Sequence, residues 1–372
     1  MADVRDVLNV LDALAPFALA AEWDNVGLLA GRPEWPASRA LLALDLTDAV
    51  AREALENRAD LLVLYHPPIF KGLRAVTPDA PGPTTLLPEL LAARVALIAL
   101  HTALDAAAGG TNDVLLDLLR IAQRWPLVPV TRVAPDLKLA VFVPAADVDR
   151  LRAALAAAGA GVIGHYQECS FELAGHGTFR GDETTQPTVG RKGVLERVAE
   201  TRLELVVPRR RLAAVIAALY ANHPYEEPAF DVYPREEVVG RGGVGLGRVG
   251  VLPRPTPGTE LLERLQGRVD LAAALVVGDL ERAFRSVTAA AGAFGVEAFR
   301  DPDSLVLTGE FKHHDALALL RRGVTTVALG HYASERPVLD MLRALLSERA
   351  PELAVQCAQS DRSPLRPALP RV

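Results

Sequence analysis

Apolar residues follow two different spacings in the N-terminal and C-terminal parts of the chain. Segments with the spacing of an amphipathic helix adjoin short apolar runs that are typical of buried strands. The helical segments are residues 4 to 15, 48 to 58, 86 to 93 and 111 to 120, and the alternation resumes near residue 259 with a helix and a strand over residues 272 to 277. This order predicts an α/β fold, in which a largely parallel sheet is flanked by helices.

The middle of the chain follows a different pattern, because residues 137 to 234 repeat the order strand, helix, strand. Two such βαβ halves make a ferredoxin-like α+β sandwich, so this region is predicted to be a separate domain inserted into the first. The predicted boundaries are 1–134 for the first half of a two-part metal-binding core, 135–240 for the insert and 241–372 for the second half of the core.

His165 and His223 occupy matching places in the two copies, at the start of predicted strands over residues 165 to 171 and 223 to 230. Nearby glutamates are consistent with a solvated sheet edge; they are Glu168, Glu226 and Glu227. We therefore interpret both histidines as turn or strand-end residues rather than as metal ligands.

Composition and charge restrict the classes of function. A chain of 372 residues with 50% hydrophobic content is long enough for two or three domains with substantial cores. The net charge of −6 argues against a broad phosphate-binding surface and hence against nucleic acid as a partner. Cys169 and Cys357 lie far apart, which suggests free thiols in a reducing compartment. Neither a signal-peptide pattern nor an apolar run of membrane-spanning length is present, so we expect a cytoplasmic location.

Ionisable residues follow four of the predicted strands. They are His66, His101, Asp105, Glu310, His331 and Glu335. Ligands bind just outside the carboxyl ends of parallel strands, so these side chains are expected at one edge of the sheet. Imidazole and carboxylate groups are ligands of divalent metals such as zinc, iron and manganese, and the pattern therefore predicts a metal site with nitrogen and oxygen donors.

Each cluster alone has a simpler explanation, because a single histidine or aspartate after a strand is usually a helix cap or a loop residue. Ser334, for example, is expected to cap a helix that starts near Glu335, with Pro337 in its first turn. Capping does not explain His331. The recurrence at four strand ends favours the metal site.

Two glycine-containing segments suggest phosphate binding but have other interpretations. Residues 245 to 250 match GxGxxG, yet they continue into an apparent strand and then into prolines, so no dinucleotide site is predicted. Residues 109 to 113 precede a helix and offer free N–H groups to an anion. A helix cap by Thr111 or Asn112 is the simpler explanation of that segment.

Five motifs together resemble the GTP cyclohydrolase 1 type 2 homolog family, also called the Ngg-one-interacting-factor-three-like family. They are Glu22-Trp-Asp-Asn-Val-Gly-Leu28, Tyr65-His-Pro-Pro-Ile-Phe-Lys-Gly72, His101-Thr-Ala-Leu-Asp105, Thr308-Gly-Glu310 and Gly330-His-Tyr-Ala-Ser-Glu335. The resemblance covers nearly the whole chain in the family's order. It implies that the insert is the PII-like domain of longer members, and that the chain forms a homo-oligomer, a ring-like hexamer around a central cavity.

The resemblance also implies a dinuclear metal site. Its ligands here would be His66, Asp105, His331 and Glu335. The family's motif reads His-His-Pro, whereas this chain has Tyr65 before His66. A phenol normally keeps its proton to near pH 10, so Tyr65 is a poorer ligand unless the metal lowers its pKa, and one or two ions per chain are both compatible with the motif. His101 is expected either to replace the missing imidazole or to support Asp105 by a hydrogen bond.

Two classes of function remain open. If the protein is an enzyme, two metals roughly 3.5 to 4 Å apart would activate a bridging water, which is hydrolase chemistry on a nucleotide or related small molecule. Glu310 and His314 are then the candidates for proton transfer, although His313 and His314 are equally explained as the start of a helix near Asp315. The alternative is a binding protein in which the metal site and the PII-like domain sense or carry a ligand without turnover.

Overall fold

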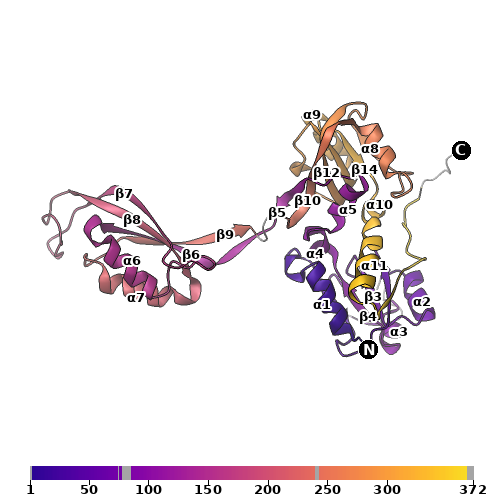
Figure 1. Cartoon of the computed structure of the whole chain (residues 1–372), viewed down its shortest axis with the longest axis horizontal. Coiled ribbons are helices and arrows are strands. Elements are labelled where there is room, and N and C mark those ends of the chain that lie inside the picture. The colour runs from indigo at the N-terminus through magenta and orange to yellow at the C-terminus, as the bar shows by residue number, and fades with distance from the viewer. Residues whose placement is uncertain (1, 74, 78–84, 239–242, 367–372) are drawn as a thin grey trace. The chain divides into compact units, whose positions relative to one another are not determined.

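The computed structural model describes residues 2–73, 75–77, 85–238 and 243–366, and Figure 1 traces the chain. These residues divide into two compact units: unit 1 is Met1–Val130 with Val239–Val372, and unit 2 is Thr131–Val238. The predicted boundary between residues 134 and 135 falls inside a strand of unit 2, and the one between 240 and 241 lies outside the described residues. Within the described ranges, no helix is long and apolar enough to cross a membrane.

The first sheet of unit 1 carries an apolar core on each face. Its strand order is β1 (Gly27–Ala30), β4 (Ala96–Ala99), β3 (Leu61–Leu64), β2 (Arg39–Ala43) and β15 (Ala354–Cys357), and only the β1–β4 pair is antiparallel. Because side chains alternate along a strand, Leu42 and Ile98 face one side and Leu41 and Leu97 the other. The first side packs against α1 (Val4–Leu14) and α11 (Pro337–Arg349), and the second against α2 (Asp48–Glu56) and α3 (Leu87–Ala92).

The second sheet of unit 1 corrects the prediction of a largely parallel sheet. Its strand order is β11 (Leu275–Val277), β14 (Thr326–Ala328), β13 (Ser304–Glu310), β12 (Ala283–Ala293), β10 (Gly245–Pro257) and β5 (Arg124–Pro129). Strands β12, β13 and β14 are parallel to one another, whereas the other pairs are antiparallel. The chain leaves unit 1 after β5 and returns through β10, which pairs with β5 in the antiparallel direction. Unit 1 therefore contains two mixed sheets.

A buried guanidinium links β10 to the helices that follow β4, which are α4 (His101–Ala106) and α5 (Thr111–Leu118). Arg248 is only 1% exposed, and its Nε donates to Oδ2 of Asp113 over 2.8 Å. Its Nη2 donates to the carbonyl oxygen of Ala107 over 2.7 Å. The GxGxxG segment is thus part of an extended strand with a structural arginine, which confirms the interpretation that it is not a strand-to-helix phosphate loop.

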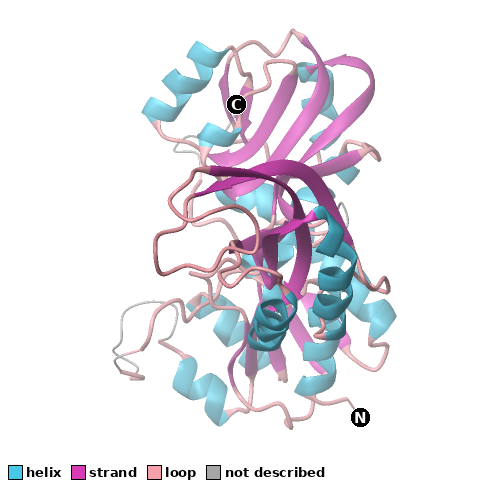
Figure 2. Ribbon diagram, turned by 90° about the vertical axis from the view of Figure 1, so that its left-hand side faces the viewer, coloured by secondary structure: helices cyan, strands magenta, loops and turns pink. Residues whose placement is uncertain are grey.

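Unit 2 is a four-stranded antiparallel sheet with two helices side by side (Figure 2). Its elements are β6 (Thr131–Pro144), α6 (Val148–Ala157), β7 (Ser170–Phe179), β8 (Glu196–Pro208), α7 (Leu212–Asn222) and β9 (Phe230–Val238), and the strand order is β7-β8-β6-β9. Apolar side chains from both helices and from the three strands β6, β8 and β9 form one core.

The strands that were predicted to begin at His165 and His223 begin later, at Ser170 and Phe230. His223 instead ends α7, where its backbone N–H donates to Leu219 O, and its ring Nε2 lies 2.9 Å from Phe142 O. His165 lies in a turn, next to Gly164, which adopts a left-handed backbone with φ +59°. Both histidines therefore precede the strands, as turn and helix-end residues.

Candidate metal centre

The strands β3 and β14 deliver the central residues of the site. Tyr65 and His66 continue β3, and their backbone N–H groups donate to Ala43 O and Leu44 O, both at 2.9 Å. After β14, Gly330 takes a left-handed φ of +98° and the chain turns directly into α10 (His331–Glu335). One helical turn separates His331 from Glu335, so both side chains project to the same face of α10.

The structure brings His66, His331 and Glu335 together. One ligand atom from each residue lies within 4.8 Å of the others. Nε2 of His66 is 3.4 Å from Oε2 of Glu335, and Nε2 of His331 is 3.2 Å from Oε1 of the same carboxylate. The Glu335 side chain is only 4% exposed, so its carboxylate lies between the two imidazoles and is largely shielded from solvent.

The geometry of Glu335 fits a bound cation. Its Oε2 is buried and accepts no hydrogen bond from a described residue, although the His66 ring is near. An unsatisfied buried carboxylate oxygen is costly and is rare in folded proteins. Ligand atoms about 2.1 Å from one tetrahedral zinc ion lie roughly 3.4 Å apart, which is close to both measured nitrogen–oxygen distances. These donors and spacings suit a borderline divalent metal.

Carboxylates also lie behind both imidazoles. Nδ1 of His66 is 3.0 Å from Oδ1 of Asp45, and Nδ1 of His331 is 3.4 Å from Oε1 of Glu310. Such partners orient metal-binding histidines and fix which nitrogen faces the metal. Burial opposes the charged form of His66, but Asp45 and Glu335 outweigh it and raise its pKa to about 10. The hydrogen bond to Glu335 likewise raises the pKa of His331, against the effect of burial.

Tyr65 is directed at Asp105. Its hydroxyl donates to Oδ1 of Asp105, and Thr111 Oγ1 lies 3.4 Å from the same hydroxyl. Burial, reinforced by Asp105 and Glu335, raises the pKa of Tyr65 well above its usual value. Burial also raises the pKa of Asp105 to about 6. The phenol of Tyr65 therefore stays protonated and donates its hydrogen bond to the Asp105 carboxylate.

His101 is held by a residue that the sequence analysis did not identify. Its Nδ1 lies 2.8 Å from Oδ1 of Asp24, and the backbone N–H of Thr102 donates to the other oxygen of that carboxylate over 3.1 Å. The His101 ring centroid is 5.2 Å from that of His66. Asp24 is largely desolvated, but its bonds to His101 and Thr102 outweigh burial and lower its pKa to about 2.

Of the two overlooked carboxylates, Asp45 had the clearer signal in the sequence. Asp45 follows β2 in the run Leu41-Leu-Ala-Leu-Asp45, so it obeys the strand-end rule that was applied to four other runs. Asp24 belongs to the motif at residues 22 to 28, but nothing in its local pattern indicates a histidine partner 77 residues away.

The two predicted proton-transfer residues lie in different surroundings. Glu310 ends β13, is exposed, and faces His331. His314 lies in the first turn of α9 (His313–Arg322), and its ring centroid is 5.5 Å from that of His313. Oδ2 of Asp315 accepts the backbone N–H of Lys312 over 3.0 Å, so the interpretation that this segment opens a helix is confirmed.

Two predicted helix caps are wrong. Oγ of Ser334 accepts the backbone N–H of Gly292 over 3.0 Å and donates to His331 O over 2.8 Å, because α10 already begins at His331. The first helical residue of α11 is Pro337, as expected. The cap of α5 is the backbone of Gly110, and the neighbouring polar side chains make other contacts; Thr111 reaches Tyr65, and Asn112 accepts the Ala291 N–H.

A cavity of about 700 Å³ adjoins the three residues His66, His331 and Glu335, which we call the donor cluster. His66, His331, Asp45 and Glu310 belong to its lining, whereas His314 is not among the described lining residues. Four arginines also line it: Arg268, Arg336, Arg362 and Arg366. A molecule in this cavity would therefore contact the donor cluster and guanidinium groups together.

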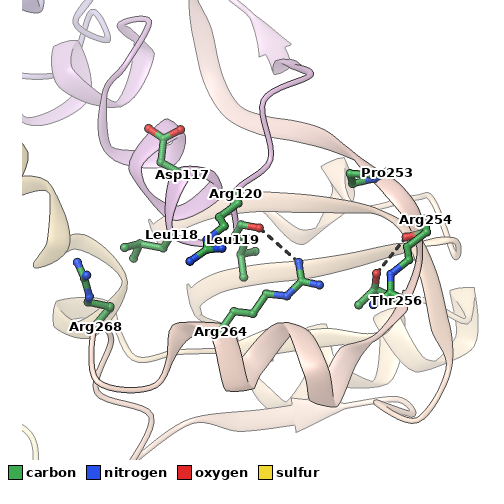
Figure 3. A pocket seen from close by; sticks show the side chains of 9 residues that line it. All are labelled: Asp117, Leu118, Leu119, Arg120, Pro253, Arg254, Thr256, Arg264 and Arg268. Carbon is green, nitrogen blue, oxygen red and sulfur yellow. Dashed lines mark hydrogen bonds between the residues drawn. The ribbon is translucent and has the colours of Figure 1, made fainter.

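A larger cavity of about 850 Å³ lies between α5, β10 and α8 (Gly258–Leu265) (Figure 3). Figure 3 shows the Arg264 side chain reaching the carbonyl oxygen of Leu119, at 3.4 Å. The only carboxylate among its described lining residues is Asp117, which pairs with Arg124 over 2.5 Å. This cavity therefore lacks a set of metal donors, and the smaller cavity is the better candidate for a metal-dependent site.

Comparison with known proteins gives concordant matches along the chain. The family model for Duf34/NIF3 (NGG1p interacting factor 3) matches residues 2–364. A Bacillus subtilis protein named GTP cyclohydrolase 1 type 2 homolog is 35% identical over 346 residues, 92% of each chain. Its Mycobacterium tuberculosis namesake is 36% identical over 341 residues, 90% of this chain and 88% of the other. A crystal structure of a Bacillus cereus protein related to NIF3 superimposes with a TM-score of 0.64 at 30% identity, covering 98% of each chain.

Proposed function

This chain belongs to the Duf34/NIF3 family, and the relatives described above are named GTP cyclohydrolase 1 type 2 homologs. On this basis we propose that it is a divalent-metal-dependent hydrolase. The observation that carries the proposal is the meeting of His66, His331 and Glu335, with a buried Glu335 oxygen that has no hydrogen-bond donor among the described residues. The substrate class is a nucleotide or a related small molecule.

The proposed ligands are His66, Asp105, His331 and Glu335, and one or two ions of zinc, iron or manganese per chain would occupy the site. A bound divalent metal lowers the pKa of water and polarises the bond under attack. Tyr65 holds Asp105 by its hydroxyl, and Asp45 fixes the orientation of the His66 ring. Glu310 lies at the cavity beside His331 and is the candidate proton acceptor, with His314 a more distant second.

The arginines of the adjoining cavity support an anionic substrate. Arg268, Arg336 and Arg362 line it together with the donor cluster. A guanidinium group presents several N–H donors in a plane and binds phosphate oxygens with two parallel hydrogen bonds. A phosphate-bearing molecule would thus be held by these arginines while its reacting bond lies toward His331 and Glu310.

The second candidate is a metal- or ligand-binding protein without turnover. The contact between Tyr65 and Asp105 favours it, because a carboxylate engaged by a phenol is less available to a second metal. Within either function, we propose that unit 2 is the PII-like insert of the long family members. We also propose a homo-oligomer, by resemblance a hexamer.

Metal analysis combined with turnover assays tests the proposal. Purified protein from metal-supplemented growth should hold about one or two equivalents of a first-row metal. It should hydrolyse GTP, another nucleotide or a simple phosphoester when supplied with that metal, and Glu335→Gln should abolish the reaction. Metal without turnover of any of these substrates would favour the binding protein. Less than a tenth of an equivalent of metal would reject the hydrolase and the metal-binding protein alike.

A further inference from the structure

Unit 2 contains a cavity that the metal centre does not explain. It measures about 490 Å³ and lies where the end of β7, the residues that follow it, and the turn after α7 come together. Tyr225, Glu226 and Glu227 of that turn belong to its lining, and β8 contributes Glu200. The turn is the one that His223 opens, for which the sequence analysis found no role beyond a turn or strand end.

The segment after β7 is tied down over this cavity by hydrogen bonds. The backbone N–H of Gln186 donates to Oε1 of Glu226 over 2.8 Å, and Thr188 Oγ1 donates to Pro224 O over 2.8 Å. Thr188 also belongs to the lining. The cavity is therefore a formed recess with a hydrogen-bonded wall, and not a gap beneath a free loop.

The lining combines aromatic rings with an excess of negative charge. The rings of Phe179 and Tyr225 have centroids 6.4 Å apart and planes inclined by 55°. Three carboxylates line the same recess, those of Glu200, Glu226 and Glu227, against the single guanidinium of Arg180. Aromatic faces attract cations through their quadrupole, and desolvation strengthens that attraction.

The carboxylate of Glu200 and the hydroxyl of Tyr225 occupy confined positions in this cavity. A Cβ on Gly177 would lie 2.1 Å from Oε2 of Glu200, so that carboxylate occupies the space over the glycine backbone. The hydroxyl of Tyr225 is buried and has no hydrogen-bond partner among the described residues. Burial, together with Glu200, raises the pKa of Tyr225 to about 12, so the phenol is neutral at physiological pH and its oxygen can accept a hydrogen bond from an ammonium group.

The spacing of the carboxylates indicates which kind of cation fits this cavity, a metal ion or a larger organic cation. Among the described residues, the only group of three or more histidine, cysteine or acidic residues whose ligand atoms all lie within 4.8 Å of one another is His66, His331 and Glu335. The glutamates of unit 2 are thus too dispersed to enclose a bare ion, but they surround a recess lined by rings. We propose that this cavity binds a small organic cation, an amine or quaternary ammonium group with an apolar body.

The test uses the full chain and a defined probe, benzyltrimethylammonium, in isothermal titration calorimetry. The expected result is saturable binding of about one equivalent per chain, with no binding of a neutral or an anionic probe that carries the same ring, benzyl alcohol or benzoate. Glu200→Gln preserves the shape of the side chain and should weaken binding by about tenfold or more, because it removes a charge beside the cation. Glu227→Gln is a second variant at an exposed position and should weaken binding in the same direction.

Two control variants locate the effect. Glu236→Gln removes an exposed charge of unit 2 that is not in the described lining, and it should leave the affinity unchanged. His331→Ala should also leave it unchanged, so that failure of the proposed hydrolase function does not decide this proposal. Absence of saturable binding would overturn the assignment. Equal affinity for benzoate, an unchanged affinity in both folded glutamate variants, or an equal loss in Glu236→Gln would overturn it as well.

Discussion

At the scale of single residues, we expect Tyr65 to limit how much metal the proposed site can bind. Tyr65→His should place an imidazole where the phenol now donates to Asp105, and a neutral imidazole is a ready ligand at pH 7. We expect the variant to bind zinc or manganese at a higher ratio or more tightly than the parent, measured by titration of the apo-protein. Unchanged binding in Tyr65→His together with a loss in Tyr65→Phe would mean that the phenol is itself a ligand.

Glu335 and Glu310 should differ in their effects on metal content. Glu335 is buried between both imidazoles, whereas Glu310 is exposed and lies 3.4 Å from the far nitrogen of His331. Loss of an outer partner typically lowers metal affinity about 10- to 100-fold, and loss of a ligand should lower it further. Elemental analysis of Glu335→Gln and Glu310→Gln, purified side by side, checks this order. Equal losses would show that Glu310 is a ligand.

The pKa of His66 makes metal binding depend on pH. Its folded-state pKa is raised to about 10 in the metal-free protein, so the ring carries a proton at pH 7 that a metal must displace. Protonation of His66 stabilises the metal-free fold fully below about pH 6.5, and this contribution is lost as the pH rises through about 10. Metal affinity should therefore increase with pH up to that value. Calorimetry in two buffers of different ionisation enthalpy should detect proton release at pH 7.5, and identical heats would contradict it.

At the scale of secondary-structure elements, a bulge in β12 makes room for the site. The pairing of β12 with β13 shifts register between Ala290 and Ala293, and Gly292 lies in the bulge with φ +66°. A Cβ at that position would be 2.4 Å from Oε1 of Glu335. A glycine here thus avoids both the strain of the left-handed backbone and a close contact with the carboxylate.

Gly292→Ala should reduce metal affinity as well as stability. The left-handed backbone alone costs about 1 kcal/mol for an L-residue. Gly323→Ala is a matched control, because Gly323 has φ +69° at the end of α9 and no atom lies within 4 Å of its added Cβ. We expect similar losses of thermal stability from the backbone strain but a loss of metal only in Gly292→Ala, measured by elemental analysis. Full metal content in that variant would show that Glu335 can move without consequence.

The sequence predicts the elements better than their pairing. The helices near residues 4, 48, 86 and 111 lie where the apolar spacing places them, because each buries one face against a sheet. Strand direction is not encoded by that spacing, so the antiparallel pairing of β5 with β10 was not predicted. The strand-end rule found His66, His331 and Glu335, but the contact of Tyr65 with Asp105 depends on side-chain packing that no local pattern records.

At the scale of the whole molecule, the pairing of β5 with β10 predicts that unit 2 is removable. Pro129 and Gly245 are partners in that antiparallel pair, so a short Gly-Ser linker from Val130 to Gly243 should span the gap as a hairpin connection. The shortened chain should remain folded and bind metal to the same ratio as the full chain. Circular dichroism and elemental analysis check both points. An unfolded product would show that unit 1 depends on the insert for its stability.

The same pairing has a kinetic consequence. Within unit 2, Thr131 and Val238 are themselves partners on β6 and β9, so the two ends of the insert are neighbours once it has folded. Closing β5 onto β10 before that point would mean ordering a loop as long as the whole insert, whereas afterwards the effective loop is only a few residues. Refolding should therefore be sequential, because the continuous middle segment can fold first through its own contacts. The folded unit 2 then holds the two distant halves of the chain close together, so that β5 and β10 can pair.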